Sequence, residues 1–166
     1  DSADYHLLVK WIQQGAAGPT DADVKLLRVE LSPGNSKLKK GDSRQLKVTA
    51  HFSDGTRRDV TPWARFNSTD ASVAIVDEKT GKAEVVGFGQ GAITAWYSGQ
   101  IAIARITSPW PNTIADAVFA QAPRRNFIDE LVLAQLRQLN LKPSPPCTDS
   151  EFIRRAHLDV VGALPT

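Results

Sequence analysis

The sequence is nearly without sulfur: its 166 residues include no methionine and a single cysteine, Cys147. One thiol cannot form an internal disulfide, so the stability of the fold has to come from side-chain packing. The same count excludes the C-x-x-C-H motif that attaches a c-type haem, and we expect this chain to bind no haem. Because a native chain begins with methionine, we also expect a processed product or a fragment of a longer protein.

Long apolar runs and an excess of one charge are missing as well. No stretch of about 18 apolar residues is present, so we expect no membrane span, and no signal peptide is recognisable. The 20 Lys and Arg residues stand against 18 Asp and Glu, which leaves a net charge of +2. These basic residues are scattered along the chain, apart from Lys37/Lys39/Lys40 and the pairs Arg57-Arg58, Arg124-Arg125 and Arg154-Arg155, whereas a nucleic-acid binder gathers them on one surface. With 42% hydrophobic and 23% charged residues, the sequence predicts a globular protein without a nucleic-acid partner.

Short segments that alternate apolar and polar residues fill the middle of the chain. Between Leu46 and Phe52 every second residue is apolar, which is typical of a strand with one buried face. Asp54-Gly55 follows as a tight hairpin turn, because this pair tolerates the positive backbone angles that such a turn needs. The period of two therefore predicts β-structure in this region.

About seven such strands, spaced by roughly 8–12 residues, are typical of a β-sandwich. The first of them alternates Leu27, Val29 and Leu31 with charged residues. The apolar residues that we expect to line the shared interior are Leu46, Val48, Phe52, Phe66, Val73, Ile75, Val85, Ile93 and Ile101.

The two flanks of this region switch to helical spacing. Residues 3–14 place apolar side chains three or four residues apart, and Asn126 is positioned to cap a helix over residues 127–140. Thr148 and Glu151 have the spacing of a capping box that opens a last helix. The sequence thus predicts a mainly β chain with flanking α-helices.

One run of residues is specific enough to indicate a family. It comprises residues 41–52, Asp54-Gly55-Thr56, Asp59-Val60-Thr61, and residues 67–77, 80–83 and 89–95. This run resembles the bacterial immunoglobulin-like domain of group 2, a module strung along adhesins and other surface proteins. The resemblance implies an immunoglobulin-like β-sandwich that acts as a scaffold or spacer. Phe66 stands where the family usually has Trp, seven residues before Val73, and it still fills the core.

The two ends resemble parts of large exported planctomycete proteins. In that family a cytochrome c-like domain is followed by an optional Ig-like domain and then by a helical domain of unknown function. Residues 7–16 resemble the last helix of the cytochrome domain, and residues 128–145 with 152–166 resemble the opening of the helical domain. The resemblance implies export to the periplasm or cell surface, and it places any haem c upstream of Asp1. The boundaries that we expect are 1–21 for the first helix and linker, 22–108 for the Ig-like domain, and 109–166 for the linker and helical segment.

No residue pattern points to catalysis or to a bound metal ion. The three histidines lie far apart, whereas zinc sites need close pairs of ligands. Asp54, Asp59, Asp70 and Asp77 lie in or beside turns, where calcium ligands occur, but they lack the D-x-D-x-D-G spacing. Aspartate also suits turns because its carboxylate bonds nearby N–H groups. No motif fixes a nucleophile, so we predict that the chain is not an enzyme and holds no catalytic, cofactor or metal residue.

Two tryptophans are the candidate interaction residues. Trp96 falls on the strand face opposite Ile93 and should point outward, and Trp63 should lie at a loop or strand edge. An exposed indole can stack on a sugar ring or anchor a protein partner. The alternative, which the sequence favours, is that a flanking segment such as Pro109-Trp110-Pro111 covers Trp96.

The sequence therefore predicts a non-catalytic structural or interaction module, a spacer or adhesion-type domain of an exported or cell-surface protein. Its expected partners are the neighbouring domains of the same chain, with protein or glycan at the cell surface. One alternative is that it belongs to a c-type-cytochrome-like electron-transfer protein whose haem domain lies upstream. A weaker alternative is a carbohydrate-binding module that uses Trp96.

Overall fold

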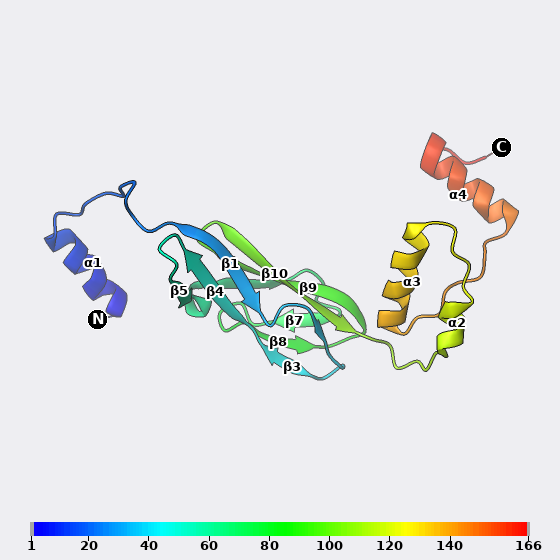
Figure 1. Cartoon of the computed structure of the whole chain (residues 1–166), viewed down its shortest axis with the longest axis horizontal. Helices are drawn as coiled ribbons and strands as arrows, with labels where there is room; N and C mark the ends of the chain where they lie inside the picture. The colour runs from blue at the N-terminus through cyan, green and yellow to red at the C-terminus, as the bar shows by residue number, and fades with distance from the viewer. Residues whose placement is uncertain (1, 166) are drawn as a thin grey trace.

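The computed structural model describes residues 2–165 and places a β-sandwich between two helical ends (Figure 1). The helices are α1 (Ala3–Gln13), α2 (Asp116–Ala120), α3 (Phe127–Leu139) and α4 (Asp149–Val161), with a 3-10 helix η1 at Thr61–Trp63. The strands are β1 (Leu26–Ser32), β2 (Ser36–Lys37), β3 (Ser43–Gln45), β4 (Lys47–Phe52), β5 (Arg57–Asp59), β6 (Arg65–Ser68), β7 (Ala74–Val76), β8 (Lys82–Val85), β9 (Gly89–Tyr97) and β10 (Gln100–Ser108). Helix α1 lies at one end of the sandwich, and α2, α3 and α4 lie at the other.

The strands form two layers with the predicted immunoglobulin-like arrangement. One layer, the β9 layer, has the strand order β2-β10-β9-β6. The other, the β4 layer, combines the sheets β1-β4-β5 and β3-β8-β7. Strands β3 and β4 are separated by Leu46 alone, so they act as one interrupted strand that joins these two sheets. The fold is therefore mainly β with flanking α-helices, as the sequence predicts.

Apolar side chains from both layers fill the space between them. Val48 of β4, Phe66 of β6 and Ile93 of β9 are at most 2% exposed. Six of the nine predicted interior residues are buried, and Phe52 is half-buried against the same cluster. Burial thus confirms the period-two pattern for most of the sandwich.

Ile75 and Ile101 are exceptions, because 44% and 47% of their surfaces are exposed. Ile101 lies directly opposite Trp96 in the β9–β10 pair, and paired residues point to the same side of a sheet. Since Trp96 faces outward, Ile101 must do so too, and the interior receives Ala102 and Ala104 instead. The prediction that Ile75 and Ile101 line the core is wrong.

Strand β1 departs from simple alternation at its beginning. Its pairing with β4 shifts between Leu26 and Arg28, which is a β-bulge or irregularity. The shift leaves Leu27 61% exposed, while Val29 packs half-buried against the core and Leu31 is buried. Leu27 therefore does not share the buried face of the strand on which the sequence pattern placed it.

The predicted helix caps are confirmed. Asn126 and Asp129 form a capping box at the start of α3, and Thr148 and Glu151 form one at the start of α4. The short helix α2 has no counterpart in the sequence prediction, and its Phe119 is buried. None of the helices within residues 2–165 reaches the length and apolarity that a membrane crossing requires.

We expect Gly81→Ala to destabilise the sandwich more than Gly55→Ala does. Both glycines have positive φ angles, +69° and +81°, so a side chain at either position costs about 1–2 kcal/mol in backbone strain. A Cβ at position 81 would also lie 2.6 Å from Cζ of the buried Phe66 ring, whereas one at position 55 meets nothing within 4 Å. Overpacking at Gly81 should add about 1–3 kcal/mol.

Urea unfolding followed by circular dichroism measures the difference between these two variants. Equal unfolding midpoints for Gly81→Ala and Gly55→Ala would show that the Phe66 ring does not press on the turn.

Candidate interaction surfaces

The outer face of the β9 layer carries an exposed apolar patch. Trp96 is 53% exposed, and its cross-strand neighbours are Ile101 on β10 and Arg65 on β6. Ile103, two residues beyond Ile101 on the same face, is 63% exposed. The outward position of Trp96 is confirmed, and Tyr97 packs half-buried against the core. We call Trp96, Ile101 and Ile103 the Trp96 patch.

The prediction that Pro109-Trp110-Pro111 covers Trp96 is wrong. Trp110 follows the last residue of β10, while Ile101, the partner of Trp96, lies near the first. The Trp110 ring packs instead near Phe88, with ring centroids 6.3 Å apart. The segment after β10 therefore lies at the opposite end of the sandwich from the Trp96 patch.

Trp63 lies in the 3-10 helix that precedes β6, and it is 63% exposed. Arg65, two residues later, pairs with Trp96, so the two tryptophans lie at the same end of the sandwich. Among the ring contacts of residues 2–165, none joins their indoles. The structure thus places the two predicted residues at one end without forming a shared aromatic platform.

The aspartates weighed as calcium ligands each close a turn of the sandwich. The Oδ1 atom of Asp54 accepts the Thr56 hydroxyl at 2.7 Å and the Thr56 backbone N–H at 2.9 Å. Asp70 accepts the Ser72 hydroxyl and N–H in the same way, and Asp59 accepts the Thr61 N–H at 3.0 Å. Since these bonds favour the ionised carboxylate, and the side-chain bond contributes most, they lower the pKa of all three carboxyls.

Asp77 closes the turn between β7 and β8. Its Oδ1 atom accepts the Thr80 N–H at 2.7 Å, the Thr80 hydroxyl at 2.8 Å and the Lys79 N–H at 3.1 Å. The bond from the Thr80 N–H is the largest cause that lowers the pKa of Asp77. Within residues 2–165, no three His, Cys, Asp or Glu side chains gather in a way that holds a metal ion. The structure thus gives these four aspartates a role in turns.

A second cluster of polar contacts joins the sandwich to α3. The Trp110 N–H donates to the Leu139 carbonyl at 3.0 Å, and the Asn140 side-chain amide donates to the Trp110 carbonyl at 3.1 Å. Asn140 ends α3 in the left-handed conformation, with φ of 54°. Both backbone groups of Trp110 are therefore bound by the end of one helix.

A glutamine pair reinforces this junction from the sheet. Gln135 of α3 donates from Nε2 to Oε1 of Gln90 on β9 at 3.0 Å. Gln90 in turn donates from its own Nε2 to the Thr107 hydroxyl at 2.8 Å. Helix α3 is thus hydrogen-bonded to the chain after β10 and to the β9 layer itself.

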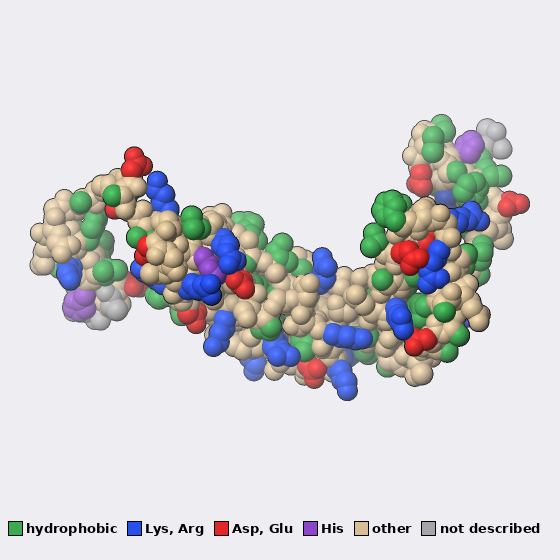
Figure 2. Space-filling view, viewed as in Figure 1, with side chains coloured by type: hydrophobic (Ala, Val, Ile, Leu, Met, Phe, Trp, Pro, Cys, Tyr) green, Lys and Arg blue, Asp and Glu red, His purple; other side chains and the backbone are tan. Residues whose placement is uncertain are grey.

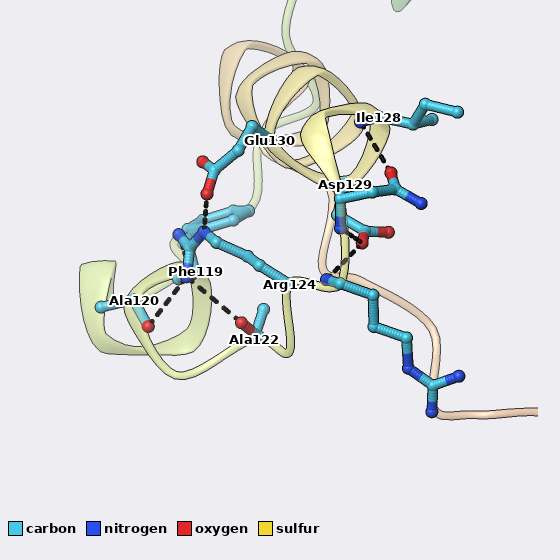
Figure 3. A network of polar contacts seen from close by, with 9 residues as sticks. Phe119, Ala120, Ala122, Arg124, Ile128, Asp129 and Glu130 are labelled. Atoms are coloured by element: carbon cyan, nitrogen blue, oxygen red, sulfur yellow. Dashed lines mark hydrogen bonds and ion pairs between the residues drawn. The ribbon is translucent and has the colours of Figure 1, made fainter.

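Arg124 connects α2 to the start of α3 (Figure 3). Its guanidinium donates to the carbonyls of Phe119, Ala120 and Ala122 at 3.0–3.2 Å, which caps the C-terminal end of α2. Its Nε atom also lies 2.9 Å from the Glu130 carboxylate on α3. One arginine therefore holds α2 and α3 together as a unit.

Basic and acidic side chains are interleaved over the face of the molecule that Figure 2 presents. Several basic groups of the described chain are paired with acids, such as Arg28 with Glu30 at 3.2 Å and Arg137 with Asp116 at 2.6 Å. This distribution agrees with the scattered basic residues of the sequence.

Comparison with known families agrees with the immunoglobulin-like architecture. Residues 27–99 match the family model of the bacterial Ig-like domain (group 2). The sandwich is therefore a bacterial Ig-like domain of group 2, as the sequence resemblance predicted. Residues 127–166 match part of the family described as protein of unknown function (DUF1549), in agreement with the predicted resemblance of this segment to a domain of unknown function.

Two curated proteins resemble segments of this chain. An S-layer-related protein of Niallia circulans is 38% identical over 87 residues, which cover 52% of this chain and 5% of that protein. Ice-binding protein 1 of Shewanella frigidimarina (strain NCIMB 400) is 27% identical over 106 residues, which cover 60% of this chain and 12% of that protein. The chain thus spans a small part of the length of either relative.

Two solved structures show a weaker likeness, each at 16% sequence identity. Domains 4–9 of the surface layer protein SbsC align with a TM-score of 0.45 over 57% of this chain and 16% of that chain. The C-terminal 282-residue fragment of intimin, solved with the intimin-binding domain of the translocated intimin receptor, aligns with a TM-score of 0.36 over 49% of this chain and 31% of that chain.

We expect the stability of the sandwich to fall in acid because of the turn aspartates. The lowered pKa values of Asp54, Asp59, Asp70 and Asp77 mean that their ionised forms are stabilised in the folded chain. This stabilisation is present above the ordinary aspartate pKa of about 4 and is lost as pH falls through the lowered folded values. The melting temperature should therefore decrease between about pH 5 and pH 2.

Replacing Asp77 by Asn tests this source of the pH dependence, because the amide keeps an oxygen acceptor but does not titrate. The decrease in melting temperature between about pH 5 and pH 2 should become smaller than in the wild type. Asp21→Asn, at an exposed acid before the sandwich, is the matched control. If the melting temperature of Asp77→Asn falls with pH as steeply as that of the wild type, the Asp77 turn does not cause the acid sensitivity.

Proposed function

We propose that residues 22–108 form a non-catalytic spacer and interaction module of an exported or cell-surface protein. The observation that carries the proposal is where the chain joins the sandwich. The Gln100 side chain donates to the Leu27 carbonyl at 3.2 Å, so β1 and β10 begin at the same end. Strand β10 then runs nine residues to Ser108 at the other end, about 30 Å away at the usual rise per residue.

Such an arrangement suits a spacer because the preceding and following segments attach at opposite ends (Figure 1). The segment after β10 is held by Trp110, Gln135 and Asn140, which supports a fixed rather than a swivelling connection. The likeness to a protein described as S-layer-related supports a place at the cell surface.

A non-catalytic role is supported by what the polar networks of the described residues do. The turn aspartates bind nearby backbone N–H groups, Arg124 caps a helix, and Gln90 links the sheet to α3. The polar side chains of each network therefore bond to groups of the protein itself and stabilise the fold. The Trp96 patch is the surface that we propose for contact with a protein or glycan at the cell surface.

Distances between spin labels test the spacer. In a Cys147→Ser background, nitroxides at Lys47→Cys on the sandwich and Leu131→Cys on α3 should give one narrow distance distribution. Gln135→Ala with Asn140→Gly removes two junction bonds while keeping the left-handed helix end, so the distribution should broaden.

Gln138→Ala on the same helix is the control for this measurement, and its distribution should stay narrow. A distribution that is already broad in the wild-type junction would contradict a rigid spacer.

We further propose that the parent is an exported protein of the planctomycete type, with a cytochrome c-like domain before the sandwich. The match of residues 127–166 supports the part after the sandwich. Leu8, Trp11 and Ile12 of α1 are 46–56% exposed, which suits a helix that packs against a preceding domain. Such a parent would be an electron-transfer protein with this module as its spacer.

The visible spectrum of the full-length parent checks this second proposal. A Soret band is expected from the full-length product, and none from residues 1–166, which lack the haem attachment motif. A full-length product without a Soret band would remove the electron-transfer alternative and leave the spacer unaffected.

A further inference from the structure

A groove of about 680 Å³ opens where the sandwich meets the helical end of the chain. This volume lies within the range of about 300–1,000 Å³ that is usual for ligand sites. One side of the groove is formed by residues 37–40, at and after the end of β2, and the other by Phe88 before β9 and residues 109–111 after β10. It lies at the opposite end of the sandwich from the Trp96 patch.

The other side of the groove is aromatic, with Phe88 from the segment before β9 and Trp110 from the segment after β10. The rings of Phe88 and Trp110 meet at an angle of 32°, with centroids 6.3 Å apart, and both residues are half-buried. Because Leu139 and Asn140 bind the N–H and the carbonyl of Trp110, its backbone is fixed. A fixed aromatic wall loses little conformational freedom when a ligand packs on it.

The opposite side of the groove is cationic. Lys37, Lys39 and Lys40 line it, with Leu38 buried between them and bonded through its N–H to the Thr107 carbonyl at 2.9 Å. The Lys40 ammonium lies 5.7 Å from the centre of the Phe88 ring. None of the ion pairs formed within residues 2–165 uses these three lysines.

The lining of the groove contains no acidic residue, and two acidic side chains next to its lysines in the sequence or in a neighbouring cavity have bonding partners of their own. The Asp42 carboxylate accepts the backbone N–H of Lys39 at 2.8 Å. Asp116, which lines the neighbouring cavity with Lys37, pairs with Arg137 at 2.6 Å. The groove therefore combines an apolar wall with a positive charge that no carboxylate in its lining offsets.

We propose that this groove binds an acidic peptide segment that sets one apolar side chain against Phe88 and Trp110 and presents carboxylates to Lys37, Lys39 and Lys40. The rings favour a peptide over a sugar. A sugar needs a flat, open ring face, whereas these two rings are tilted and the Lys40 ammonium lies over the face of Phe88. An apolar side chain fits a tilted pair, and carboxylates complement the lysines.

Fluorescence anisotropy with a labelled peptide, Glu-Glu-Phe-Glu-Glu, tests the site on the whole chain. Binding is expected at low salt and should weaken at physiological ionic strength, because exposed charges are screened there. The charge-reversed peptide Lys-Lys-Phe-Lys-Lys should bind about tenfold more weakly or not at all. A peptide of five glutamates should bind more weakly than the labelled peptide, because it has no apolar side chain to bury against the rings.

Two triple variants with the same net charge locate the site. Lys37→Gln with Lys39→Gln and Lys40→Gln should weaken binding about tenfold, as expected for three exposed ion pairs. The matched control removes Lys47, Lys79 and Lys82 in the same way, elsewhere on the sandwich, and should bind like the wild type. Circular dichroism melts establish that both variants are folded.

Three results would overturn the proposal. Equal losses in the two triple variants would mean attraction by net charge alone. Equal binding of the five-glutamate peptide would exclude the aromatic wall. Binding of an acidic oligosaccharide such as oligogalacturonate in preference to the peptide would show that the partner class is wrong. None of these outcomes bears on the label distances that test the spacer.

Discussion

The whole structure depends on the shared interior of two layers that no cross-link joins. Phe66 stands at its centre: it belongs to β6 in the β9 layer, and its ring lies against the Gly81 turn of the β4 layer. Burial of one large apolar side chain contributes about 1.5–3 kcal/mol, whereas a whole domain has a net stability of about 5–15 kcal/mol. A few contacts of this kind therefore decide whether the sandwich is folded. The surfaces described above keep their shape because the strands that carry them are packed on this interior.

Much of this sandwich could be predicted, because period-two patterning and turn chemistry are local. Which face of a strand is buried is not local. Ile101 and Ala102 are both apolar, so the sequence alone does not say which of them faces the core. The pairing of Ile101 with the outward-facing Trp96 on β9 decides that Ala102 does. Leu27 is displaced by an irregular register with β4, for which its own sequence gives no signal. Helix α2 is five residues long, too short for a helical period to appear.

For the interaction surfaces too, features set by the local sequence could be predicted and features set by the path of the chain could not. The outward direction of Trp96 follows from its own strand, so it could be predicted. Whether another segment covers it depends on the path of the chain after β10, and Trp110 takes that path toward α3 instead. The groove could not be predicted from the sequence, because Lys37 and Trp110 lie far apart in the chain and are brought to one groove by the pairing of β2 with β10. Its one local signal is three lysines within four residues.

The two ends of the sandwich differ in chemistry, and this difference constrains what a spacer of this kind can do. The Trp96 patch is apolar, with Arg65 beside it, so a partner there would gain free energy mainly from burial, which salt weakens little. The groove joins rings to three lysines, so a partner there would be held partly by charge that salt screens. Ile103 of the patch and Trp110 of the groove are seven residues apart in the chain, about 20 Å at the usual rise per residue, so one rigid module can contact a partner at each end. Ionic strength then distinguishes which end a given partner uses.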